Sequence, residues 1–208
     1  MSFILSKRIM VSAFLLCLIF PVAEAQAIWE IGGKGGTNFY LGDENSAIFN
    51  KIQPVLGLYV RKNQNPRWVT KFQFASGSIT SPMKQNYVDF SLQEEFNFFE
   101  YGLLNSESWT RLFSPYICAG LGLSLFTGAS NESIFTPDLP FGVGVKWKVL
   151  KHVNIGLEWT MHKLFSDKFD YVDDPYKING TSYTKQDWYS MCTLMIGYDL
   201  GNRSSYCR

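Results

Sequence analysis

The sequence predicts an all-β fold, an eight-stranded antiparallel transmembrane β-barrel with a side-chain-filled lumen. Three observations support this prediction: several segments alternate strictly between apolar and polar residues, their polar face carries glycines and charges, and their connections alternate between short and long. Strict alternation is typical of β-strands. Short turns on one side and long loops on the other are typical of outer-membrane barrels.

The clearest alternation lies in residues 139–161, LPFGVGVKWKVLKHVNIGLEWTM. In both arms the odd-numbered residues are apolar, and the even-numbered ones are mostly glycine, charged or polar. A three-residue turn at 150–152 would join the arms and set Lys146 and Glu158 each opposite a glycine. These two side chains would then lie diagonally, within reach of each other.

Six further segments show the same alternation. In chain order they are 29–37, which glycines weaken at its end, then 55–62, 68–76, 87–99, 116–126 and 188–200. With the hairpin arms 139–149 and 153–161 they make eight strands, an even number. Each is about long enough to cross a tilted apolar band of ~25 Å.

The connections fall into two sets when both chain ends are taken as periplasmic. The extracellular side would hold the long segments 38–53, 77–86, 127–138 and 164–186. The periplasmic side would hold tight turns at 63–66 and 150–152, together with one long segment, 100–114. Apart from 100–114, this is the outer-membrane arrangement.

The inner face is expected to carry charges that balance in number. The residues placed there are Lys34, Arg61, Lys71, Lys146, Lys148, Glu30, Asp89, Glu95, Glu158 and Asp199. An eight-stranded barrel is just wide enough to be filled by its own side chains, and buried charges have to be paired. We therefore predict a salt-bridged plug rather than a channel, with Lys146, Glu158, Lys71 and Glu95 in its ion pairs.

Glu94 interrupts the apolar face of segment 87–99. Two interpretations remain open: a bulge that shifts the phase of the strand, and a face that contacts another protein. The bulge is favoured.

The start of the chain has the order of regions of a secretory signal peptide. Lys7 and Arg8 precede an apolar run that ends in Ala23-Glu24-Ala25, so we expect residues 1–25 to be removed and 26–208 to form the barrel, with 201–208 as a periplasmic tail. Without Lys7, Arg8 and Glu24, the 19 basic and 18 acidic residues become 17 of each. This neutrality argues against nucleic-acid binding.

Three cysteines remain after this processing, an odd number that leaves at least one without an internal partner. The strand phases put Cys118 on an inner face and Cys192 on an outer face, so a bridge between them is not expected. Cys207 lies in the tail, where an oxidising compartment would favour a disulfide to a partner protein. A free tail cysteine is equally compatible with the sequence.

No catalytic, metal or cofactor site is predicted. His162 with Ser166 and Asp167 is the best candidate cluster for a lipid A-modifying enzyme, but no oriented third group is visible, so His162 is interpreted as an ordinary residue of the membrane-interface girdle. The acidic residues of 164–186 match no calcium-loop spacing.

Five blocks of the chain resemble a known family. They are LQEEFNFFEYG (92–102), SPYICAGLGLSLF (114–126), residues 139–167, YVDD (171–174) and DWYSMCTLMIGYDLG (187–201). In this order they look like the PorG-like outer-membrane barrels of Bacteroidetes. Glu94 departs from the pattern, because a leucine-like residue would fit the family there.

The resemblance implies a non-enzymatic role in the type IX secretion system. The barrel would be the outer-membrane anchor of a periplasmic ring built from a lipoprotein and a second ring protein. On this interpretation we expect partner contacts at Trp109, Arg111, Tyr206 and Cys207. Two alternatives remain, a surface adhesin or protective small barrel and a lipid A-modifying enzyme.

Overall fold

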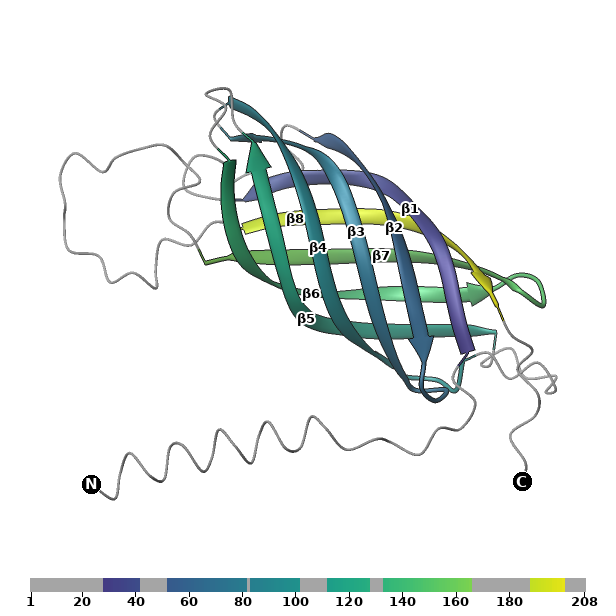
Figure 1. The fold of residues 1–208 in the computed structure, drawn as a ribbon. Helices are drawn as coiled ribbons and strands as arrows, with labels where there is room; N and C mark the ends of the chain where they lie inside the picture. Colours follow the sequence, from purple (N-terminus) through teal and green to yellow (C-terminus); the bar gives the residue numbers. More distant parts are fainter. Residues whose placement is uncertain are drawn as a thin grey trace, which may run out of the picture.

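Eight antiparallel strands close into one barrel in chain order, with the first strand paired to the last (Figure 1). The computed structural model describes residues 28–41, 52–81, 83–101, 112–127, 133–165 and 188–200. The strands are β1 (Ile28–Leu41), β2 (Gln53–Asn63), β3 (Trp68–Ser81), β4 (Met83–Asn97), β5 (Phe113–Thr127), β6 (Ser133–Lys148), β7 (Val153–Leu164) and β8 (Trp188–Asp199). The predicted fold class is confirmed. No helix in these residues is long and apolar enough to cross a membrane.

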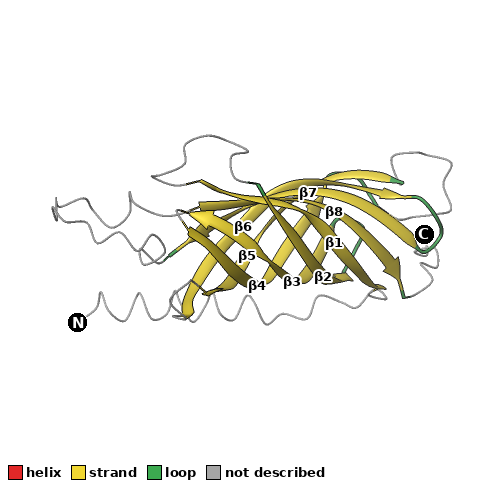
Figure 2. Cartoon of the chain, turned by 90° about the horizontal axis from the view of Figure 1, so that it is seen from above, coloured by secondary structure: helices red, strands yellow, loops and turns green. Residues whose placement is uncertain are grey.

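The two ends of the barrel differ. One end, called the turn end here, holds the short connections at 64–67 and 149–152, the start of β1 and the finish of β8. The opposite end, called the loop end, holds the last residue of β1, β5 and β7. Figure 2, turned by 90°, shows the strands running obliquely across the barrel wall, as closure of a sheet requires.

Several strands extend beyond their predicted bounds at the loop end. The predicted loop at 77–86 is wrong, because β3 and β4 pair as far as Ser81 and Met83 with only Pro82 between them. The predicted loop at 127–138 is wrong in its second half, because β6 begins at Ser133. These extensions carry polar residues and prolines, which resemble a loop in sequence although the backbone ladder continues.

The register of the β6–β7 hairpin is the one predicted. Lys146 lies opposite Gly156, and Glu158 lies opposite Gly144. A slip of one residue would have turned every side chain of the hairpin to the other face, so the alternation fixes the register.

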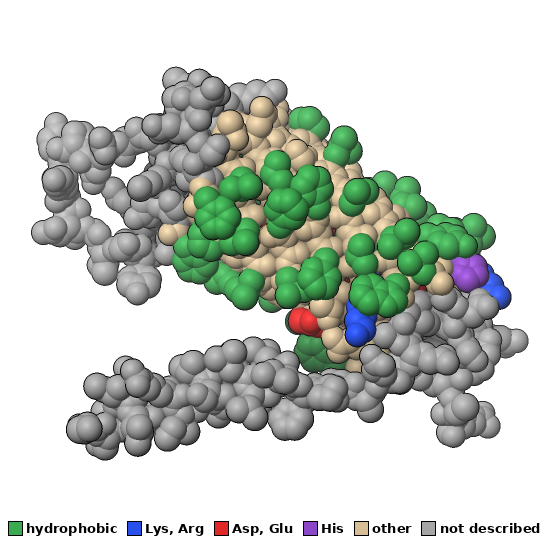
Figure 3. Space-filling view, in the orientation of Figure 1, with side chains coloured by type: hydrophobic (Ala, Val, Ile, Leu, Met, Phe, Trp, Pro, Cys, Tyr) green, Lys and Arg blue, Asp and Glu red, His purple; other side chains and the backbone are tan. Residues whose placement is uncertain are grey.

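The apolar faces point outward. Leu56 is 71% exposed, Leu121 is 68% exposed, and Leu157 and Leu194 are similarly uncovered near the middle of their strands. Figure 3 shows hydrophobic side chains spread over the visible wall of the barrel. Such a surface is stable only against acyl chains, so the strands span a membrane with their charged faces inside.

Buried side chains of the described residues line the lumen from the turn end to the loop end. All ten charged residues predicted for the inner face are buried. Toward the loop end an apolar cluster fills the bore; its members are Val55, Ala75, Ile79, Tyr87, Phe126, Leu164, Tyr189 and Met191. Glycines make room for the large side chains: a Cβ at Gly144 would collide with the Tyr116 ring.

Candidate functional site

Glu95 is the centre of the ion-pair network in the middle of the lumen. Its carboxylate accepts from Arg61 Nε at 3.2 Å, lies 3.1 Å from Lys71 Nζ, and also contacts Lys146 Nζ. Arg61 continues the network to Glu30 at 2.9 Å. Strands β1 to β4 and β6 are therefore tied together across the bore.

Lys146 and Glu158 do not form the expected diagonal pair. Lys146 contacts Glu95, and Glu158 contacts Lys71. The reason is Tyr116, whose hydroxyl donates to Glu158 at 2.7 Å and whose ring lies 4.4 Å below the Lys146 ammonium. This aromatic side chain separates the two charges and turns each toward the opposite wall.

At the turn end, the lumen contains a residue of the predicted connection 100–114. Tyr101 follows β4, is buried, and donates to Asn154 Oδ1 at 2.9 Å. Asn154 in turn donates to Glu30 at 3.0 Å and to Asp199 at 2.9 Å, and Asp199 pairs with Lys148 at 2.5 Å. The start of the segment after β4 is thus anchored inside the barrel.

A second cluster lies in the loop-end half of the lumen, around His162. Its Nδ1 is 2.6 Å from Asp138 Oδ2, 2.9 Å from the Tyr189 hydroxyl and 3.8 Å from Asp89 Oδ2. The girdle interpretation of His162 is wrong, because the side chain is fully buried. The sequence does contain a signal for this inward orientation. His162 has an even number on β7, as do the inward-facing residues Asn154, Gly156 and Glu158. Asp138 lies in the segment 127–138 that the sequence predicts as a loop, so the alternation does not place it on a face.

The remaining sequence-based candidates divide into two groups. Trp109, Arg111, Tyr206 and Cys207 lie outside the described residues, as do Ser166, Asp167, the leader 1–25 and the tail 201–208. Cys118 is buried, Cys192 is half-buried, and both are free thiols, so no bridge joins them.

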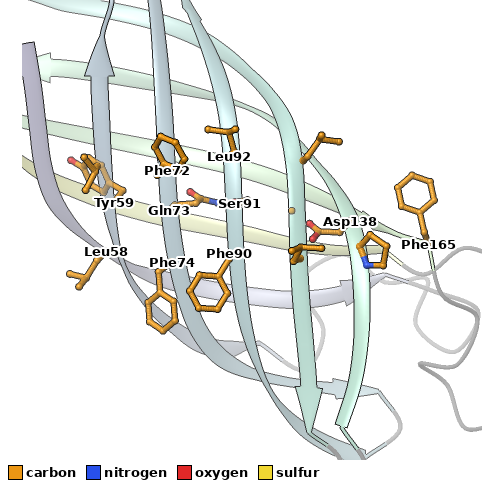
Figure 4. Close-up of a pocket in the computed structure, with 15 residues that line it drawn as sticks. Leu58, Tyr59, Phe72, Gln73, Phe74, Phe90, Ser91, Leu92, Asp138 and Phe165 are labelled. Carbon is orange, nitrogen blue, oxygen red and sulfur yellow. The ribbon is translucent and has the colours of Figure 1, made fainter. Parts of the chain in front are cut away.

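A shallow groove of about 710 Å³ runs over the membrane-facing wall (Figure 4). It is lined mainly by apolar side chains, among them Leu58, Phe72, Phe74, Phe90 and Leu92. On a wall of this composition acyl chains fill such spaces, so the groove is a lipid contact.

Glu94 faces outward without a bulge. It pairs with Thr70 on β3 and Ala119 on β5 in an uninterrupted register, so the favoured bulge interpretation is wrong. The Thr70 hydroxyl donates to the Glu94 carboxylate at 2.6 Å and accepts from Gln64 at 2.7 Å. A short polar path therefore leads from Glu94 to the turn end of the barrel.

Replacing Glu94 by leucine is expected to stabilise the isolated barrel in lipid vesicles by about 1 kcal/mol, because a carboxylate on the lipid face is unfavourable. Urea unfolding of Glu94→Leu beside the native chain measures this effect. A loss of stability would show that the contact with Thr70 outweighs the cost of placing the carboxylate there.

A closed barrel with an apolar outer wall and buried ion pairs in its lumen defines a small outer-membrane β-barrel protein. Within this class, the chain belongs to the family described as a domain of unknown function (DUF6089), whose model matches residues 7–208. A comparison with curated protein sequences gives no match.

Solved structures of small outer-membrane barrels share the fold. Neisserial surface protein A (NspA) is 11% identical with a TM-score of 0.57, over 82% of this chain and 96% of that one. The N-terminal β-barrel of Pseudomonas aeruginosa OprF is 13% identical with a TM-score of 0.48, over 84% and 100%. Ail, the attachment invasion locus protein of Yersinia pestis, is 17% identical with a TM-score of 0.46, over 84% and 97%. At these identities the likeness concerns the fold alone.

Proposed function

We propose that this protein is a non-enzymatic anchor of the outer membrane that holds or organises a periplasmic ring of the type IX secretion system. The observation that supports this proposal best is the filled lumen. Ion pairs occupy its middle, Tyr101 is hydrogen-bonded to Asn154 at the turn end, and a cluster of buried apolar side chains lies toward the loop end. A barrel of this kind passes no substrate, so it acts through its surfaces.

The turn end is the surface that we assign to the partner, with both chain termini in the periplasm. Tyr101 fixes the chain just before residues 102–111, the segment that contains the proposed contacts Trp109 and Arg111. Tyr206 and Cys207 would add contacts from the tail, and Cys207 would supply a disulfide to the partner. Because Tyr101 fixes the start of residues 102–111, this segment would lose less conformational entropy when it becomes ordered on binding a partner.

Co-purification from native membranes tests the proposal. The full-length barrel should retain the periplasmic ring proteins, and replacing residues 102–111, which leaves Tyr101 and β5 intact, or removing 201–208 should release them. Removing 166–187 at the loop end is the matched control and should leave the complex intact.

The opposite result would favour a surface adhesin or protective barrel, in which the loop end carries the function. For the disulfide, Cys207→Ser should abolish any slower-migrating species on a non-reducing gel of isolated membranes. Absence of that species in the native chain would refute the disulfide while leaving the anchor role to the co-purification.

A further inference from the structure

The cluster around His162 is the part of the lumen that the anchor role does not explain. Five neighbouring strands contribute to it: Asp89 comes from β4, Ser124 from β5, Asp138 from β6, His162 from β7 and Tyr189 from β8. Each of these side chains is buried, with an exposed fraction of 1% or less.

The charges of this cluster are not balanced by basic residues. Glu30, Glu95, Glu158 and Asp199 each have a Lys or Arg partner. Within the described part of the chain, Asp89 and Asp138 have only His162 at ion-pair distance. Among the described residues, Lys34 has no carboxylate at ion-pair distance: its ammonium donates to Gln73 at 2.8 Å and interacts with Asp89 only over a longer distance. One imidazole carries at most one positive charge, so two ionised carboxylates leave a buried negative charge without compensation.

The geometry brings three metal-ligating groups together. One atom each of Asp89, Asp138 and His162 lies within 4.8 Å of the others. Tetrahedral ligands at Zn–N and Zn–O distances of about 2.0–2.2 Å stand roughly 3.3–3.6 Å apart. The separation of His162 Nδ1 from Asp89 Oδ2, 3.8 Å, is close to that value. For a metal at these bond lengths, the 2.6 Å separation of His162 Nδ1 from Asp138 Oδ2 has to open by about an ångström.

Neighbouring side chains hold the three groups in place. The Tyr189 ring stacks on the imidazole with centroids 4.4 Å apart, and its hydroxyl lies 3.2 Å from Asp89 Oδ2. Ser124 donates to Asp89 at 3.2 Å or to Asp138 at 3.3 Å. Both hydroxyls therefore lie within hydrogen-bond distance of proposed ligand groups.

We propose that Asp89, Asp138 and His162 bind a divalent transition-metal ion of the Zn²⁺ class inside the barrel. An imidazole nitrogen with two carboxylate oxygens suits such an ion, whereas Ca²⁺ and Mg²⁺ prefer more ligands, all of them oxygen. The ion neutralises both carboxylates and links β4, β6 and β7 across the bore. Because all three ligand side chains are buried, we expect the ion to enter before the barrel closes.

The test is refolding of the full-length barrel from urea into detergent with ZnCl₂, followed by desalting and elemental analysis. The native chain should retain one zinc ion per chain, and its urea midpoint should be higher than that of protein refolded in EDTA. His162→Ala and the double variant Asp89→Asn, Asp138→Asn should retain none. His152→Ala removes the only other histidine, at the turn end, and should retain zinc like the native chain.

Refolding of the native chain with Co²⁺ gives a second measurement that needs no variant. Co²⁺ bound by one nitrogen ligand and oxygen ligands should give visible absorption bands. EDTA should not remove these bands until the barrel unfolds. If the native chain retains no zinc and gives no such bands, the cluster shares protons only and the proposal is wrong. Retention of zinc by His162→Ala at the native level would equally overturn it. These results are independent of whether ring proteins co-purify.

Discussion

Glu95→Gln is expected to destabilise the barrel by about 3–5 kcal/mol, the cost of breaking a buried ion pair by removing one partner. Glu95 is fully buried and contacts Arg61, Lys71 and Lys146. The amide keeps the shape of the side chain but removes the charge that holds three cations together. Because Lys71 retains Glu158 and Arg61 retains Glu30, Lys146 loses the most.

Urea unfolding in lipid vesicles measures this change, and Glu94→Gln is the matched control. Glu94 is the preceding residue on β4, carries the same group and points to the opposite face of the sheet. Its substitution should change the free energy of unfolding by about 1 kcal/mol or less. Equal effects at the two positions would mean that the lumen network contributes no more than a surface carboxylate.

The contrast between Glu94 and Glu95 also shows that the alternation of apolar and polar residues predicts which face of a strand a side chain occupies. The phase of each strand follows from its apolar residues, and this phase placed all ten lumen charges correctly. A period of two leaves only two possible faces, and lipid outside the barrel accepts only one of them. A bulge at Glu94 is predicted because a carboxylate is costly on that face, yet the carboxylate lies there without any change of register and accepts one hydrogen bond from Thr70.

Which lumen cation contacts which lumen carboxylate could not be predicted from the phase of the alternation along each strand. Neighbouring strands suggested that Lys146 would contact Glu158, but in a bore this narrow side chains reach the opposite wall. Tyr116 intervenes, and Gly144 is what leaves room for its ring. Partner choice therefore depends on the packing of large side chains in three dimensions, which a strand-by-strand pattern does not contain.

The His162 cluster was missed for a related reason. His162 lies near the end of β7, and Asp138 directly precedes residue 139, where the alternation predicts the start of its strand. Once β6 is known to begin at Ser133, Asp138 falls on the inner face opposite Gly122, whose missing side chain leaves space for the carboxylate. Strand length, which the sequence underestimated at the loop end, was thus the missing information.

Leu121→Arg should be among the most damaging substitutions on the outer wall, because a charge at the middle of the bilayer costs about 2–4 kcal/mol. Leu121 lies near the centre of β5 and is 68% exposed. Its matched control is Leu150→Arg: Leu150 is 63% exposed but lies in the turn between β6 and β7. There the same charge reaches water and should cost about 0–1 kcal/mol.

Comparing Leu121→Arg with Leu150→Arg tests the depth of each residue in the membrane, because the two leucine side chains are similarly exposed. Urea unfolding in vesicles, followed by tryptophan fluorescence, gives the two free energies. For a wall in contact with acyl chains the arginine at Leu121 must either distort the bilayer or extend along β5 toward an interface, and both cost free energy. For a wall in water neither penalty exists, so equal and small effects at Leu121 and Leu150 would contradict a membrane-spanning barrel.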